Sequence, residues 1–145
     1  MIQKYGNLFD TTQTHVGHGV NTYGVMGAGI AKEFKARYPH NFKQYKAWCD
    51  SGEAKGGDFL LSGEQNKILV NIASQERPGR HAKMQYLVIA LTTLARNRPG
   101  ITLALPEIGC GIGGLEWGSV KSALQEIEVW NDIEFEVWHY SPEKP

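Results

Sequence analysis

The chain has few cysteines, no excess of either charge and no long apolar run among its 145 residues. Cys49 and Cys110 are too few for a disulfide scaffold and lie in unrelated contexts, which favours a reduced, cytoplasmic protein. The 15 Lys and Arg residues balance 15 Asp and Glu residues, so the counterion-displacing excess of a general nucleic-acid binder is missing. No segment approaches the roughly 20 apolar residues of a membrane span, and the N-terminus lacks a signal peptide's basic and apolar blocks. We therefore expect one domain over residues 1–145 with no membrane partner.

Glycine, by contrast, is plentiful, and it gathers in two loops. The first reads Val25-Met26-Gly27-Ala28-Gly29-Ile30-Ala31, and the second runs from Leu105 to Leu115. Glycine allows a positive φ and removes the Cβ that would keep a ligand away from main-chain N–H groups. Unpaired N–H groups at the start of a helix also favour a phosphate. Two such loops in one small domain suggest a ligand whose diphosphate is held from both sides.

Strand-like and helix-like segments alternate along the chain. The clearest helix is expected over 80–96, where Met84, Leu87, Val88 and Leu91 recur at helical spacing. Further helices are expected over 28–38, 42–49 and 117–127, and strands over 2–9, 14–21, 59–61, 68–72, 101–105 and 133–140. This order predicts a mostly parallel sheet with helices on both faces, in which ligands bind at the carboxyl ends of the strands. Both glycine loops lie at that edge.

The motifs together resemble those of a macrodomain. The resemblance is carried by Gly6-Asn7-Leu8-Phe9, His18-Gly19-Val20-Asn21, the first glycine loop, and Leu105 to Gly111 followed by Gly114-Leu115-Glu116-Trp117. It points to the branch that holds ADP-ribose-1''-phosphate phosphatases, the terminal ADP-ribose glutamate hydrolase and the antitoxins that remove ADP-ribose from DNA. What it implies is a three-layer α/β/α fold with a mixed, mostly parallel sheet of about six strands that binds ADP-ribose.

The same resemblance implies a role for each matching residue. Asn7 stands where the family has an acidic residue that accepts the adenine amino group, and Tyr140 is a candidate to pack against adenine or the proximal ribose. Asn21 matches an asparagine that holds a hydroxyl of the distal ribose. The implied ADP-ribose contacts are Asn7, Leu8, Gly27, Ala28, Gly29, Ile30, Ile108, Gly109, Cys110, Gly111, Ile112, Gly113, Gly114 and Tyr140. Each also has an ordinary alternative, because the glycines can serve tight turns and the asparagines can cap them.

Catalytic residues are harder to place. The glutamate hydrolase type uses a lysine and an aspartate, and neither is present in 71–75 or 111–114. His18 and Asn21 are the remaining catalytic candidates, since an imidazole with a pKa of about 6.5 can transfer protons near neutral pH. His18 is equally consistent with a half-buried strand histidine. Cys110 has no histidine partner in its local sequence, and Glu107 is a weak candidate to orient water.

We expect hydrolysis at C1'' of an ADP-ribose derivative without cofactor or metal, ADP-ribose-1''-phosphate phosphatase activity being the first choice. The alternatives are a mono-ADP-ribosyl hydrolase acting on protein or nucleic acid, and a reader that binds ADP-ribose without turnover. A metal pair of His15 and His18 is disfavoured because strand residues three apart face opposite sides. A dinucleotide-dependent oxidoreductase is also disfavoured, because Gly27-Ala28-Gly29 leads to Lys32 where that fingerprint needs glycine.

Overall fold

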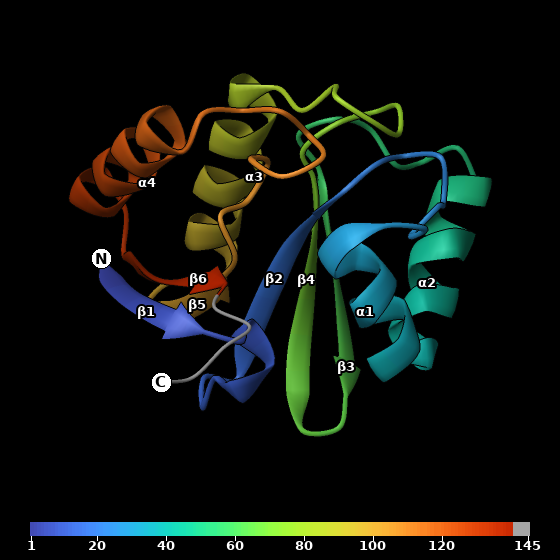
Figure 1. The fold of residues 1–145 in the computed structure, drawn as a ribbon, viewed down its shortest axis with the longest axis horizontal. Coiled ribbons are helices and arrows are strands. Elements are labelled where there is room, and N and C mark those ends of the chain that lie inside the picture. The colour runs from blue at the N-terminus through green and yellow to red at the C-terminus, as the bar shows by residue number, and fades with distance from the viewer. Residues whose placement is uncertain (141–145) are drawn as a thin grey trace.

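A six-stranded sheet forms the centre of the computed structural model, which describes residues 1–140 (Figure 1). The strand order is β1-β6-β5-β2-β4-β3, and every neighbouring pair is parallel except β3 and β4. The strands are β1 (Ile2–Gly6), β2 (His15–Val20), β3 (Phe59–Glu64), β4 (Lys67–Ala73), β5 (Ile101–Leu105) and β6 (Ile133–Tyr140). The expected mixed, mostly parallel sheet is confirmed.

Helices cover both faces of this sheet. One face carries α1 (Gly29–Arg37) and α2 (Pro39–Asp50), and the other carries α3 (Met84–Asn97) and α4 (Trp117–Trp130), as Figure 1 shows. A 3-10 turn, η1 (Leu8–Asp10), follows β1. Each glycine loop connects a strand to a helix of a different face, the first joining β2 to α1 and the second joining β5 to α4. The two loops therefore meet at the carboxyl edge from opposite sides.

The two faces have different cores. Between the sheet and α3/α4 the buried side chains are aliphatic apart from Phe135, and they include Leu87, Leu91 and Leu94. Beneath α1 and α2 the core adds aromatic side chains to aliphatic ones, with Phe34 and Tyr45 fully buried. Alternation along β2 explains the division, since Val16, His18 and Val20 face the aromatic side.

Several predicted boundaries were wrong. Helix α3 begins at Met84, and residues 80–83 belong to the preceding loop, with Lys83 at the N-cap position. The first strand ends at Gly6, whose φ of 146° only glycine readily adopts, and Asn7 then caps the 3-10 turn. Pro39 does not only close α1; it also opens α2 in the first helical turn, where its missing N–H is not needed. Within residues 1–140, no helix is both long and apolar enough to cross a membrane.

Candidate functional site

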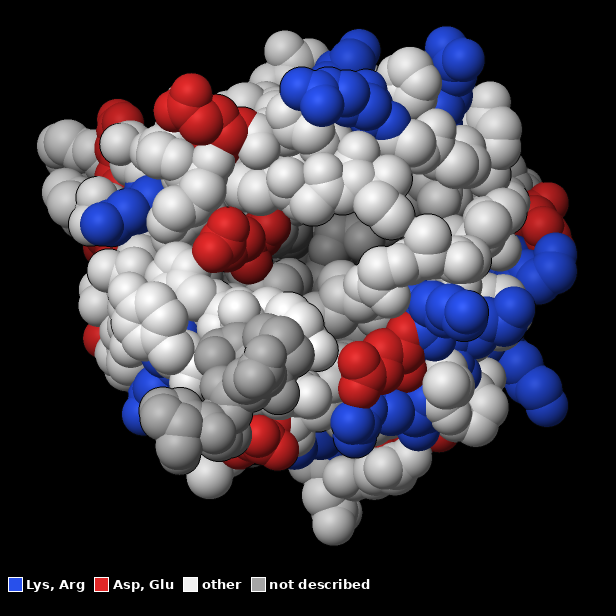
Figure 2. Space-filling model, viewed as in Figure 1, with Lys and Arg blue, Asp and Glu red and all other residues white. Residues whose placement is uncertain are grey.

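A cavity of about 780 Å³ opens at the carboxyl edge of the sheet, between the two glycine loops. Its volume falls in the range of small-molecule and cofactor sites, roughly 300–1,000 Å³. Figure 2 shows it as a hollow with acidic groups at its left and lower right and basic groups farther out. Among residues 1–140 no lysine or arginine lines it, while Glu33 and Glu107 both do. An anionic ligand would therefore be held by main-chain N–H groups.

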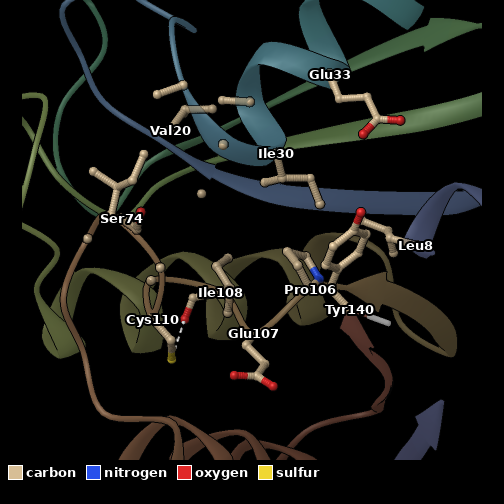
Figure 3. A pocket seen from close by; sticks show the side chains of 18 of the residues that line it. Leu8, Val20, Ile30, Glu33, Ser74, Pro106, Glu107, Ile108, Cys110 and Tyr140 are labelled. Atoms are coloured by element: carbon tan, nitrogen blue, oxygen red, sulfur yellow. Dashed lines mark hydrogen bonds between the residues drawn. The ribbon is translucent and has the colours of Figure 1, made fainter. Parts of the chain in front are cut away.

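Most of the predicted contact residues do line the cavity. They are Asn7, Leu8, Asn21, Gly27, Ala28, Gly29, Ile30, Ile108, Gly109, Cys110, Gly111, Ile112, Gly113 and Tyr140. Figure 3 shows Leu8, Ile30, Ile108 and Tyr140 around one opening. Two predicted site residues, His18 and Gly114, do not line it. Gly114 turns the chain with a φ of +85° instead, and the side chain of Arg80 lies over it.

The placement of His18 corrects the sequence-based expectation. Its side chain is fully buried and stacks on Phe34, with 3.8 Å between ring centroids. Its Nε2 lies 2.9 Å from Asn71 Oδ1, and burial lowers its pKa to about 4. A histidine at the mouth of the first loop was expected from its position three residues before Asn21. Alternation along the strand turns the ring into the core instead, so it cannot reach a ligand in the cavity.

Asn21 holds the first glycine loop in place. Its Oδ1 accepts hydrogen bonds from the Tyr23 amide and the Tyr45 hydroxyl, at 3.0 and 2.8 Å. Its Nδ2 donates to the Val25 carbonyl at 2.9 Å, and a second Nδ2 hydrogen remains for another acceptor. Tyr45 is fully buried, and its single hydroxyl hydrogen is shared between Asn21 Oδ1 and the Asn21 carbonyl, which lies 2.7 Å away. The loop is thus anchored from behind by a side-chain network.

The second glycine loop is braced by the backbone. Leu115 N donates to the Gly109 carbonyl at 2.8 Å, and Gly114 N donates to the Gly111 carbonyl at 3.2 Å. Within the described chain no hydrogen bond uses the amides of Gly111, Ile112 or Gly113. A Cβ at Gly111 would meet no atom within 4 Å, whereas one at Gly113 would lie 2.7 Å from the Ala82 Cβ. Gly111 therefore borders open space, and Gly113 is a packing glycine.

Cys110 lies in the same loop but is not placed as a nucleophile. Its thiol points to the Ile108 carbonyl, 3.4 Å away (Figure 3). Burial, followed by the nearby Glu107 carboxylate, raises the thiol pKa to about 11. The thiolate that nucleophilic attack needs is therefore scarce at neutral pH. This environment fits a small loop residue that contributes its backbone, and not its thiol, to the cavity.

A third loop, which sequence reasoning did not assign to the site, completes the cavity. Ser74, Gln75, Pro78 and Gly79 line it between β4 and α3. Gln75 Nε2 donates to the carbonyls of Arg77 and Gly79, at 2.6 and 2.8 Å, and so shapes this loop. The available signal was its position, because a polar loop that follows a parallel strand reaches the same edge as the glycine loops.

An acid–imidazole pair lies at the rim of the cavity. Glu107 Oε2 is 2.6 Å from His139 Nδ1, and His139 Nε2 is 2.8 Å from Gln3 Oε1. Tyr5 stacks on the His139 ring with 4.9 Å between centroids, while Trp117 meets it edge-on. Glu107 is thus fixed by a partner outside the cavity. Within residues 1–140, no three His, Cys, Asp or Glu side chains are grouped so that they could hold a metal ion.

The fold and the site together define a class: a three-layer α/β/α domain with a cavity between two glycine loops at the carboxyl edge of its sheet. The family comparison agrees. Residues 18–124 match the Macro domain family, and the chain belongs to that family. The resemblance expected from the glycine loops is confirmed.

Individual relatives refine the picture. The chain is 31% identical to a DNA ADP-ribosyl glycohydrolase of Thermus aquaticus over 94% of this chain and 40% of that protein. It is 26% identical to an ADP-ribose 1''-phosphate phosphatase of Candida albicans over 77% of this chain and 80% of that protein. Among solved structures, the macrodomain of Mycobacterium tuberculosis DarG superposes with a TM-score of 0.82 at 29% identity, covering 97% of this chain and 99% of that one. The chain therefore spans less than half the length of the glycohydrolase.

Proposed function

We propose that this protein binds ADP-ribose and hydrolyses the bond at C1'' that joins it to a macromolecule. The observation that carries the proposal is the cavity between two glycine loops, whose free amides suit a diphosphate. The glycohydrolase relative, at 31% identity, favours de-ADP-ribosylation over the phosphatase activity expected first from the sequence. De-ADP-ribosylation therefore becomes the first candidate activity and phosphate release the second.

Binding rests mainly on the backbone. The amides of Gly111 and Ile112 face the diphosphate from one side, and those at the start of α1, from Gly29 and Ile30, face it from the other. Peptide dipoles at a helix start and unpaired amides stabilise an anion without a basic side chain. Glu107 would repel such an anion, and its hydrogen bond with the His139 imidazole reduces that repulsion.

The reaction takes place at the end of the cavity bordered by Asn21, Ser74 and Gln75. A water oxygen forms a bond to C1'' while the bond from C1'' to the attached group breaks. The attached group leaves with the bonding electrons and takes up a proton, and water loses one. Asn21 is assigned the positioning of the distal ribose through its second Nδ2 hydrogen. Because neither a lysine nor His18 is among the described residues that line the cavity, the substrate's own diphosphate is assigned the positioning of water.

Phosphate release from ADP-ribose-1''-phosphate is the second candidate activity. The observation that favours it is length, because the chain matches the Candida albicans phosphatase over 80% of that protein. In this reaction water attacks phosphorus and the phosphate oxygens carry the developing charge, which amides of the second glycine loop would stabilise.

The deciding experiment offers three substrates to the purified protein: mono-ADP-ribosylated single-stranded DNA, mono-ADP-ribosylated protein and ADP-ribose-1''-phosphate. We expect free ADP-ribose from a macromolecular substrate at a rate above that of phosphate release. Faster phosphate release would favour the second candidate. Binding of ADP-ribose without turnover of any substrate would contradict both activities and leave a reader. The Gly111→Val variant serves as the control for contaminating hydrolases.

A further inference from the structure

Large apolar and aromatic side chains form part of the cavity lining. They are those of Leu8, Phe9, Ile30, Trp138 and Tyr140. Figure 3 shows Tyr140 and Leu8 on one side of this opening and Ile30 on the other, with the Glu33 carboxylate directed toward the same space. On the proposed function, on which this inference rests, this part of the cavity receives the base.

Asn7 by itself is a weak acceptor for the amino group of that base. Its side-chain oxygen already accepts a hydrogen bond from the Phe9 amide at 2.9 Å, which caps the 3-10 turn. It also carries no charge, and hydrogen bonds to an ionised acceptor are roughly twice as strong as neutral ones. The charged acceptor implied for this position by the family resemblance is therefore missing.

Glu33 lies on α1 three residues after Ile30, so both side chains share one helical face and both line the cavity. Its Oε2 is engaged by Arg37, whose Nε and Nη2 lie 2.8 and 2.7 Å away. Arg37 in turn lies over the Phe9 ring, 4.4 Å from its centroid. The pair holds the carboxylate in position and offsets its charge, while no hydrogen bond of the described residues engages Oε1.

We propose that Glu33 is a specificity residue: its Oε1 accepts the exocyclic amino group of the base and so selects adenine over a 6-oxo purine. An amino group donates to the carboxylate. A carbonyl oxygen at the same position would face it as a second acceptor, and two acceptors without a proton between them repel each other. Arg37 acts as a positioning residue for this contact.

The test compares ADP-ribose with inosine diphosphate ribose, which differs in carrying a 6-oxo base, in calorimetric titrations. We expect wild type to prefer ADP-ribose by at least about tenfold. Glu33→Gln, whose amide can accept or donate, should narrow the preference to about threefold or less. Glu107→Gln is the matched control, because it removes the other carboxylate of the cavity and should change both affinities alike.

An unchanged preference in Glu33→Gln would overturn the assignment and leave the Glu33–Arg37 contact as a surface ion pair, with ADP-ribose binding itself intact. Equal wild-type affinities for the two ligands would also overturn it. Failure of wild type to bind either ligand would instead refute the proposed function and this inference with it. Because the Glu33 side chain is partly exposed, we expect the variant to fold, and circular dichroism checks this.

Discussion

Helices α1 and α2 cover one face of the sheet with aromatic and polar side chains, whereas α3 and α4 cover the other with aliphatic ones. Each face backs one glycine loop. The first loop is held by side-chain hydrogen bonds of Asn21 and Tyr45, and the second by backbone hydrogen bonds and close packing against the third loop. One wall of the cavity therefore depends on a buried polar network and the other on the space around its glycines.

The two walls of the cavity should therefore be sensitive to different kinds of substitution. Substitutions behind the first loop should act through hydrogen bonds and protonation, because His18, Asn71 and Asn41 form a buried polar chain there. Substitutions in the second loop should act through volume.

Gly111→Val should weaken ADP-ribose binding by at least about 100-fold, or about 2.7 kcal/mol. The fold should survive, because a Cβ at this position meets no protein atom and the φ is ordinary. Calorimetry measures the affinity and thermal unfolding checks the fold. Gly63→Val, in a hairpin strand away from the cavity, is the control and should bind normally. Unchanged affinity in a folded Gly111→Val protein would mean that the phosphates bind elsewhere.

Acidification should destabilise the aromatic face through His18. Its pKa is about 4 in the folded protein and about 6.5 when unfolded, so below pH 6.5 only the unfolded chain takes up the proton. The free energy of unfolding should therefore fall as the pH drops from 6.5 to 4, by about 2 kcal/mol from this residue at pH 5. Above pH 6.5 this residue adds no pH dependence.

Urea unfolding at pH 7 and pH 5 measures this loss. His18→Gln is the comparison, because glutamine can still hydrogen-bond Asn71 but does not titrate. The other histidines contribute equally to both proteins, so wild type should lose more stability than the variant. Identical losses would show that His18 is not held neutral.

Gly113→Ala should cost about 1–3 kcal/mol of stability, the range for overpacking a filled site. The added Cβ would lie 2.7 Å from the Ala82 Cβ and 2.8 Å from the Gly109 carbonyl. Chemical denaturation checks the change. A variant as stable as wild type would mean that the third loop moves aside at little cost. The second glycine loop and the third loop would then not stabilise each other.

Tyr45→Phe should have the smallest effect, about 1 kcal/mol. It removes the hydroxyl that donates to Asn21 while leaving the buried ring in place. We expect a modest loss of stability together with a several-fold loss of affinity, since the first loop loses an anchor. Lost stability with unchanged affinity would show that this network does not shape the site.

The sequence predicted the sheet and most of the cavity because glycine loops, strand runs and helical spacing are local signals. Gly27 and Gly111 could be assigned to the cavity from the residues that flank them in the sequence. His18 could not, since its direction depends on the strand's alternation relative to α1. The third loop was missed because Ser74 and Gln75 reach the cavity only through the parallel pairing of β2 and β4. Glu33 was missed because a charged residue in a helix is usually predicted to face solvent.

Calorimetric titration of ADP-ribose into the wild-type protein, with a metal chelator present, tests most directly whether the two loops form a diphosphate site. We expect binding with a dissociation constant of roughly 1 μM, corresponding to about −8 kcal/mol. We expect the amides of both loops to supply this binding without a metal. Absence of heat at millimolar ADP-ribose would contradict the assignment of the cavity.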